Sequence, residues 1–212
     1  MRQSKTNEAS QPELPDAYVE LRVNIDFKSS SEKGIGTVAV TSAGRGEGRT
    51  TTAVNLASAY AQSGKRTVLV DADIRNPGIH AVYGDSNTRG LTNVLNGTSE
   101  LSEALAVSDM RNLSLLYAGP GTAQASDLLS SKEMDDLLLR LKREFDIVVV
   151  DAPPVIGHID SKIVSAKCDG VVFVVQQGKV KRSLAKRSKE ELERVKANIL
   201  GVLMNKDKTV KV

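Results

Sequence analysis

A glycine-rich segment holds the residues whose chemistry is the most specific in this chain. It reads Ala43-Gly-Arg-Gly-Glu-Gly-Arg-Thr-Thr51 and stands between a β-branched run and a helical pattern. Phosphate binding needs backbone N–H groups that approach the ligand closely and the positive end of a helix dipole, and glycines permit that approach. The segment therefore predicts a phosphate-binding loop (P-loop) for a nucleoside triphosphate with Mg²⁺. Taken alone, it is also compatible with a structural strand-to-helix turn.

The positions of this loop have separate expected roles. The residues expected to line the nucleotide are Gly44, Arg45, Gly46, Glu47, Gly48, Arg49, Thr50 and Thr51. Thr50 occupies the hydroxyl position that binds Mg²⁺, and residue 49 presents the cation that reaches the β- and γ-phosphates. Here that cation is Arg49 instead of the usual lysine, and a planar guanidinium is not equivalent to a compact ammonium. We therefore expect binding to be kept and turnover to be reduced.

Two acidic motifs follow, each at the end of an aliphatic run. Val68-Leu-Val-Asp71-Ala-Asp73-Ile-Arg75 places two carboxylates two positions apart on an extended segment, where their side chains share a face. Ile147-Val-Val-Val-Asp151-Ala-Pro-Pro154 ends an apolar run in a carboxylate, as a Walker B strand does when its Asp holds Mg²⁺. Asp71 or Asp151 alone could be a cap. Together with the loop, both motifs favour a site for a nucleotide and a metal.

The elements that must position these residues alternate along the chain. Strands are expected at 37–41, 67–70, 113–117, 147–150, 171–175 and 199–204, and helices at 16–27, 51–62, 132–145, 161–166 and 183–196. Runs that are apolar on both faces and joined by helices predict an α/β fold, a mostly parallel sheet with helices on both faces. Ligands then bind at the carboxyl ends of the strands. We expect a disordered leader at 1–15, one domain at 16–208 and a short tail at 209–212.

The composition argues against several classes of protein. A net charge of +3, with 3% aromatic residues and no Trp, is a weak basis for binding nucleic acid, so no such partner is expected. No apolar run approaches the roughly 20 residues that span a bilayer. The single Cys168 excludes an internal disulfide, and no secretion signal opens the chain. These features favour a cytoplasmic protein.

Together the motifs resemble those of the bacterial tyrosine kinases of capsule and exopolysaccharide synthesis, relatives of the septum-site and plasmid-partition ATPases. The resemblance covers about residues 16–206 and includes a closing Leu-Met-Asn205-Lys. It implies a P-loop NTPase fold of the deviant Walker type, with ATP and Mg²⁺ as cofactors. It also implies a non-specific protein-tyrosine kinase that modifies itself or other proteins. The implied partner is a transmembrane polysaccharide co-polymerase that activates the kinase and holds it at the inner face of the membrane, with a homo-oligomer possible.

The resemblance also assigns roles to residues outside the loop. It implies that Asp71 is the candidate base, that Asp73 organises Mg²⁺ or phosphate and that Asp151 holds the metal. Arg75 would stabilise charge or dock an acidic neighbour, and Asn205 would meet the adenine edge. The catalytic set is then Arg49, Asp71, Asp73 and Arg75, and the metal set is Thr50, Asp73 and Asp151.

The chain departs from the family pattern in places that bear on activity. Its first helix has Asp16, Val19 and Arg22 where the family has a Glu-x-x-Arg-x-x-Arg pattern implicated in ring assembly, and no Tyr-rich tail follows residue 206. Two alternatives therefore stay open. One is a partition-type ATPase switch, although its early loop lysine is replaced by Gly44 with Arg45 beside it. The other is a catalytically weak, ATP-binding regulatory subunit of the polysaccharide machinery.

The remaining candidates have simpler interpretations. Tyr60 and Tyr117 are expected in the core, and Tyr18 and Tyr83 are scattered. His80 and His158 lack metal-ligand or nucleophile partners at a usual spacing, which favours structural or surface roles. Asp160 is expected to cap a helix rather than join the second shell of the metal. Cys168 is expected to be a packing residue. The basic cluster at 179–189 is expected to be a solvated helix face rather than a contact for an anionic surface.

Overall fold

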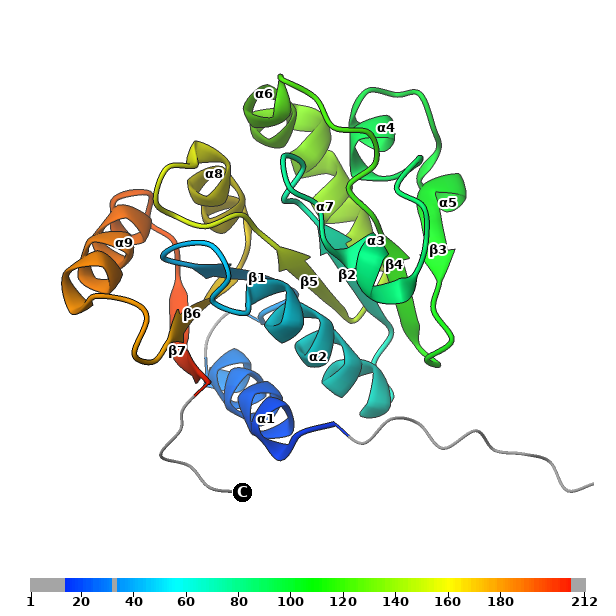
Figure 1. The fold of residues 1–212 in the computed structure, drawn as a ribbon. Helices are drawn as coiled ribbons and strands as arrows, with labels where there is room; N and C mark the ends of the chain where they lie inside the picture. Colours follow the sequence, from blue (N-terminus) through cyan, green and yellow to red (C-terminus); the bar gives the residue numbers. More distant parts are fainter. Residues whose placement is uncertain (1–13, 32–33, 207–212) are drawn as a thin grey trace, which may run out of the picture.

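The sheet at the centre of the molecule is seven-stranded. A computed structural model describes residues 14–31 and 34–206 (Figure 1), so most of the expected leader and the tail at 209–212 lie outside the described residues. The strands are β1 (Thr37–Ser42), β2 (Thr67–Asp71), β3 (Leu105–Val107), β4 (Leu113–Leu116), β5 (Ile147–Asp151), β6 (Gly170–Gln176) and β7 (Ile199–Asn205). Their order is β3-β4-β2-β5-β1-β6-β7. All neighbouring pairs are parallel except β3 with β4.

Helices cover both faces of this sheet. They are α1 (Asp16–Ser31), α2 (Arg49–Gln62), α3 (Ile79–Tyr83), α4 (Leu91–Leu95), α5 (Leu101–Ala104), α6 (Ala125–Ser130), α7 (Lys132–Glu144), α8 (Ile159–Lys167) and α9 (Arg182–Arg194). Buried side chains of α1, α2 and α3 pack on one face and those of α4 to α9 on the other, as Figure 1 shows for α2 and α7. The expected α/β fold with a mostly parallel sheet is confirmed.

The strands alternate their side chains between two cores because successive residues of a strand point to opposite faces. Val38 and Val40 of β1 pack with α1 and α2, whereas Ala39 between them packs with the opposite layer. Every residue of β1, β2 and β5 is buried. This double burial explains why the apolar runs were recognisable as parallel strands from the sequence.

The short elements were not expected. Helices α3 to α6 have between four and six residues, too few to show a helical period in the sequence, and β3 is a three-residue antiparallel edge strand. All lie between β2 and α7, in the part of the chain that covers the β4 side of the sheet. The sequence therefore predicted the central strands but missed the edge strand β3 and the short helices near it.

The strand order places the motifs together. β1 lies between β5 and β6, and β5 in turn pairs with β2, so the carboxyl ends of β1, β2 and β5 are adjacent. In parallel sheets, ligand sites form at these ends, where the chain leaves neighbouring strands in different directions.

Among the helices of residues 14–31 and 34–206, none has the length and apolar character that a membrane span needs.

Asp169 binds the backbone at the amino-terminal end of β1, opposite the predicted ligand site. Its Oδ2 accepts hydrogen bonds from the backbone N–H groups of Gly36 (2.9 Å) and Thr37 (2.8 Å), and Lys142 Nζ donates to its Oδ1 at 2.9 Å. Burial raises the pKa of Asp169, but these hydrogen bonds outweigh burial and hold the pKa below its ordinary value. The carboxylate thus aligns the start of β1 with the start of β6.

We predict that Asp169→Asn lowers the free energy of unfolding by about 2 kcal/mol at pH 7, because the charged hydrogen bonds at β1 are lost. The depressed pKa means that this stabilisation is present above the unfolded-state pKa near 4 and disappears as pH falls through the folded-state pKa. Urea unfolding at pH 7 and pH 3 measures it. Asp109→Asn, at an exposed bend, is the control; equal effects of the two substitutions at pH 7 would contradict the prediction.

Candidate functional site

The P-loop connects β1 to α2. Gly46 (φ 71°) and Gly48 (φ 97°) adopt left-handed conformations, which glycine tolerates and which anion-binding nests of backbone N–H groups use. Gly48 caps α2 and has no side chain that could accept the first N–H groups of this 14-residue helix. These donors are therefore available to an anion at the positive end of the helix. The backbone has the form that phosphate binding requires.

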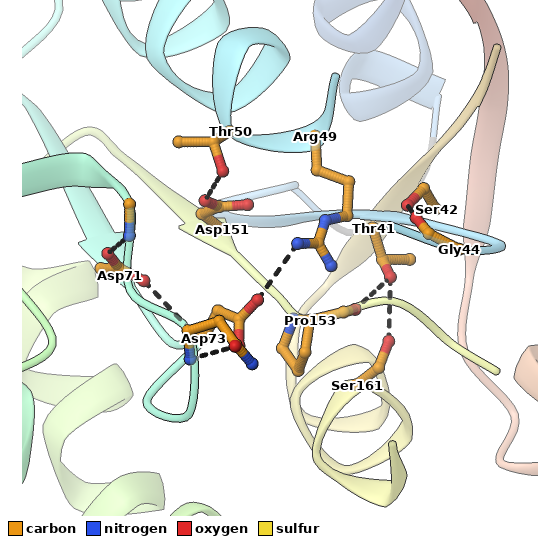
Figure 2. Close-up of polar contacts among 12 residues, drawn as sticks. Thr41, Ser42, Gly44, Arg49, Thr50, Asp71, Asp73, Asp151, Pro153 and Ser161 are labelled. Carbon is orange, nitrogen blue, oxygen red and sulfur yellow. Dashed lines mark hydrogen bonds and ion pairs between the residues drawn. The ribbon is translucent and has the colours of Figure 1, made fainter. Parts of the chain in front are cut away.

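Thr50 and Asp151 join the loop to β5. Thr50 Oγ1 donates to Asp151 Oδ2 (Figure 2), with 2.6 Å between the two oxygens. The other carboxylate oxygen of Asp151 is buried without a hydrogen bond. Burial, and then the charge of Asp71, raise the pKa of Asp151 to about 7. A hydroxyl beside an unsatisfied buried carboxylate suits Mg²⁺, which usually binds to one or two carboxylates and to substrate phosphates. No cluster of three His, Cys, Asp or Glu side chains suited to a metal occurs in the described residues.

Arg49 and Asp73 join the loop to the segment after β2. Arg49 Nη2 lies 3.1 Å from Asp73 Oδ2, and only 11% and 4% of the two side chains are exposed. The second terminal nitrogen of Arg49 is buried without a hydrogen bond. Figure 2 shows the guanidinium reaching across the site from the start of α2 toward Asp73. Arg49 thus neutralises one carboxylate and retains a donor for a phosphate oxygen.

Asp71 is completely buried and accepts backbone hydrogen bonds at both oxygens. The N–H of Asp73 donates to Oδ1 at 3.1 Å, and those of Gly78 and Ile79 donate to Oδ2 at 2.9 and 3.0 Å. Burial raises its pKa to about 6, against the lowering effect of these N–H groups. The carboxylate therefore holds the 71–79 loop in shape, a role that the sequence did not predict.

This chain is similar to known proteins along most of its length. A protein-family model described as an AAA domain matches residues 36–201. The tyrosine-protein kinase YwqD of Bacillus subtilis (strain 168) is 38% identical over 196 residues, which are 92% of this chain and 82% of that protein. This chain belongs to the bacterial tyrosine-protein kinase family.

Solved structures of similar fold agree with the assignment of this chain to the tyrosine-kinase family. The crystal structure of the chimerical protein CapA2B2 has a TM-score of 0.88 and 30% identity, and the match covers 95% of this chain and 88% of that one. The septum-site-determining protein MinD of Pyrococcus horikoshii, complexed with Mg-ADP, has a TM-score of 0.70 and 19% identity, over 83% and 72% of the two chains. The second match shows the shared P-loop NTPase fold. The family and fold predicted from the motifs are confirmed.

In this kinase family member Arg75 does not point at the P-loop. Its Nε donates to Asp160 Oδ2 at 2.7 Å and its Nη2 donates to Ser126 Oγ at 3.1 Å, while Ser126 also donates to Asp160. The expectation that Asp160 caps a helix was wrong, because α8 begins at Ile159 and Asp160 lies in its first turn. The carboxylate instead ties Arg75, after β2, to α8. The catalytic role of Arg75 stays a prediction.

Asn205 lies beside the P-loop. Its Nδ2 donates to the backbone oxygen of Glu47 at 2.8 Å, and its Oδ1 accepts from the N–H of Lys206 at 2.9 Å. A hollow of about 370 Å³ adjoins it, lined by Gly46, Gly48, Arg49, Thr50, Thr51, Asn205 and Lys206. The structure therefore gathers most of the predicted nucleotide-binding residues around one hollow. Contact of Asn205 with adenine stays a prediction.

Glu47 and Lys179 differ from what the sequence suggested. The Glu47 side chain turns under the loop, where it is buried and accepts a hydrogen bond from the N–H of Gly44. Lys179 was expected on a solvated helix face, but α9 begins only at Arg182, and Lys179 Nζ donates to the backbone oxygen of Arg45 at 3.0 Å. Its position just after an apolar strand, where parallel sheets form ligand sites, is the signal that would have found it.

The simpler interpretations hold for the core residues. Tyr60 and Tyr117 are buried at 0% and 4% exposure, as expected. Cys168 is also buried, and burial raises the pKa of its thiol to about 12, which agrees with a packing role. His158 stands at the start of α8 without capping it through its side chain. None of these residues adds to the site.

We predict that Asp151→Asn raises the free energy of unfolding of the nucleotide-free protein at pH 8 by about 2 kcal/mol, because an unfavourable buried charge is removed. The raised pKa means that wild-type stability falls as pH rises from about 4 to about 7, since the folded state holds the proton longer than the unfolded state. The gain should therefore be small at pH 5. Urea unfolding at both values measures it, and a variant less stable than wild type at pH 8 would contradict it.

Proposed function

We propose that this chain is an ATP-dependent protein-tyrosine kinase that phosphorylates itself or other proteins in capsule or exopolysaccharide synthesis. The observation that carries the proposal is the pair of contacts Arg49–Asp73 and Thr50–Asp151, which join one P-loop to both acidic motifs. The 38% identity to a tyrosine-protein kinase over most of both chains supports this activity over that of a general ATPase.

The residues supply what phosphoryl transfer requires, which is chiefly position and neutralisation of charge. In the reaction the tyrosine oxygen bonds to the γ-phosphorus, the bond from that phosphorus to ADP breaks, and the hydroxyl loses its proton. The N–H groups of the loop and α2 orient the phosphates, and Arg49 stabilises charge on the γ-phosphate. Thr50, Asp73 and Asp151 would hold Mg²⁺, which neutralises the phosphate oxygens when bound.

Asp71 is the candidate acceptor of the hydroxyl proton. A pKa of about 6 lies near the pH of the cell, where a general base combines a high ionised fraction with useful basicity. Its three backbone donors would have to rearrange, at least in part, for a tyrosine to approach. This coupling makes the 71–79 loop part of the catalytic step in the proposal.

We also propose a location and a partner. The motifs resemble those of kinases that act with a transmembrane co-polymerase, which would hold this chain at the inner face of the membrane. Among its own tyrosines, Tyr60 and Tyr117 are buried, so any self-phosphorylation without unfolding would fall on the half-buried Tyr18 or Tyr83. Other proteins are the alternative substrates.

Phosphotyrosine mapping tests the proposed function. The purified chain is incubated with ATP and Mg²⁺, with and without the cytoplasmic segment of a membrane polysaccharide co-polymerase, and with a tyrosine peptide. Phosphotyrosine that disappears in a folded Asp71→Asn variant supports the kinase. Steady release of ADP without phosphotyrosine would instead identify a partition-type switch. Binding of ATP without either product would identify a regulatory subunit.

We predict that Arg49→Met lowers kcat/KM for phosphoryl transfer by about 100-fold or more, because the cation at the γ-phosphate is lost. Arg49→Lys should keep at least the wild-type rate, since an ammonium is the cation usual at this position. Initial rates at several ATP concentrations measure both effects. Arg66→Met, which removes an exposed arginine paired with Asp146, is the control. An inactive Arg49→Lys variant would show that this site depends on the guanidinium instead.

A further inference from the structure

The backbone oxygens of P-loop residues 44–47 all accept hydrogen bonds from side chains. Ser42 Oγ donates to the backbone oxygen of Gly44 at 2.7 Å, and Lys179 Nζ donates to the backbone oxygens of Arg45 (3.0 Å) and Gly46 (3.4 Å). Asn205 Nδ2 donates to the oxygen of Glu47 at 2.8 Å. Four consecutive peptide oxygens therefore accept hydrogen bonds from side chains, and two of those side chains come from the far end of the sequence.

This arrangement sets the direction of the peptide groups. The N–H and C=O of one peptide unit point in opposite directions because the unit is planar and trans. A donor that holds the oxygen on the outer side of the loop therefore keeps the N–H on the inner side, where a phosphate binds. Glycines leave these peptides free to rotate, so external donors are needed to fix them. Lys179 and Asn205 supply such donors at residues 45–47.

The two donors lie tightly against the left-handed glycines. A Cβ atom at Gly46 would stand 3.0 Å from Lys179 Nζ, and one at Gly48 would stand 1.9 Å from Asn205 Nδ2. The requirement for glycine at residue 48 therefore has two causes, its positive φ and the approach of Asn205. These contacts fix where the loop lies relative to the sheet as well as how its peptides point.

Both donors belong to one unit at the carboxyl ends of β6 and β7. Gln176 of β6 pairs with Asn205 of β7, and the N–H of Gln177 donates to the backbone oxygen of Asn205 at 3.0 Å. Lys179 follows in the turn that leads to α9, with its own N–H bonded to the oxygen of Gln176 at 3.3 Å. The strands hold the donors in place, and the donors hold the loop.

We infer that Lys179 and Asn205 are positioning residues that brace the P-loop from outside and keep its N–H groups directed at the phosphates. This inference rests on the proposed nucleotide binding. It gives Asn205 a role that does not require adenine, and it gives Lys179 a role that does not require contact with the γ-phosphate. The two residues act through the backbone of residues 45–47.

The experiment compares Lys179→Met, Lys179→Arg and Asn205→Leu with wild type. Calorimetry measures the Kd for Mg·ATP, Mg·ADP and Mg·tripolyphosphate, and hydrogen exchange with mass spectrometry follows the segment 43–49 without nucleotide. Lys186→Met is the matched control, because Lys186 is a lysine on the same turn-and-helix segment whose side chain is 78% exposed. Thermal unfolding confirms that each variant is folded.

Lys179→Met and Asn205→Leu should each raise the Kd by about three- to tenfold, the usual effect of one or two lost hydrogen bonds, and by the same factor for all three ligands. Both should also speed exchange in segment 43–49. Lys179→Arg should restore most of the affinity, and Lys186→Met should change nothing. Asn205 is uncharged, so its effect cannot be a loss of long-range attraction to phosphate.

Several results would overturn the inference. A loss confined to ATP and tripolyphosphate in Lys179→Met would show direct contact with the γ-phosphate. A loss for ATP and ADP but not for tripolyphosphate in Asn205→Leu would show that this residue only recognises adenine. Unchanged exchange and unchanged Kd in the folded variants would show that the brace is not needed. Wild-type protein that binds none of the three ligands would overturn the proposed function itself, whatever the exchange data show.

Discussion

Three carboxylates are buried together at the carboxyl ends of β2 and β5, and the rest of the site depends on this constraint. Asp71 and Asp151 are opposite each other in the register of β2 and β5, and Asp73 follows closely. Their exposed fractions are 0%, 1% and 3%. Buried charges of one sign repel each other and lose hydration, so each must be neutralised by a nearby donor. The donors chosen by the fold determine what each carboxylate can do.

The three carboxylates are neutralised to different degrees. Asp71 has three backbone donors and Asp73 has the guanidinium of Arg49, whereas Asp151 has one hydroxyl, that of Thr50, and one unsatisfied oxygen. A divalent cation therefore gains the most at Asp151. The same contacts connect the P-loop to the two acidic motifs, so a nucleotide that moves the loop also acts on Asp73 and Asp151. The buried, incompletely neutralised Asp151 is unfavourable for the stability of the nucleotide-free protein, and in the proposed function Mg²⁺ would offset this cost.

The sequence was sufficient for the parts of the molecule that local pattern determines. Strands buried on both faces appear as apolar runs, and Asp71, Asp73 and Asp151 end those runs, so their convergence followed from the rule that parallel strands form sites at their carboxyl ends. Contacts between residues distant in sequence could not be predicted in this way. Lys179 reaches the P-loop only because β6 lies next to β1, and no local pattern contains that strand order.

The hydrogen-bond partners of Asp160 and Asp71 also could not be predicted from local sequence. A carboxylate near the start of a helix is usually a cap, but a nearby guanidinium offers a stronger, charge-assisted partner, and Asp160 binds Arg75 instead. Asp71 was predicted to be a base, which stays a prediction; what the sequence did not show is that the chain after it turns back, so that the N–H groups of Gly78 and Ile79 both donate to Oδ2 of Asp71. In both cases the partner is supplied by tertiary structure that the motif alone does not specify.

If Asp151 is the carboxylate that holds Mg²⁺, as proposed, its pKa of about 7 requires it to carry a proton in part of the nucleotide-free molecules near neutral pH and to release that proton when Mg²⁺ and nucleotide bind. Calorimetry of Mg·ATP binding in buffers with different enthalpies of ionisation measures this release directly. The raised pKa values of Asp71 and Asp151 predict release of a large fraction of a proton at pH 6.5, little at pH 8.5, and less at pH 6.5 in Asp151→Asn. Binding enthalpies that are independent of the buffer at pH 6.5 would contradict the claim.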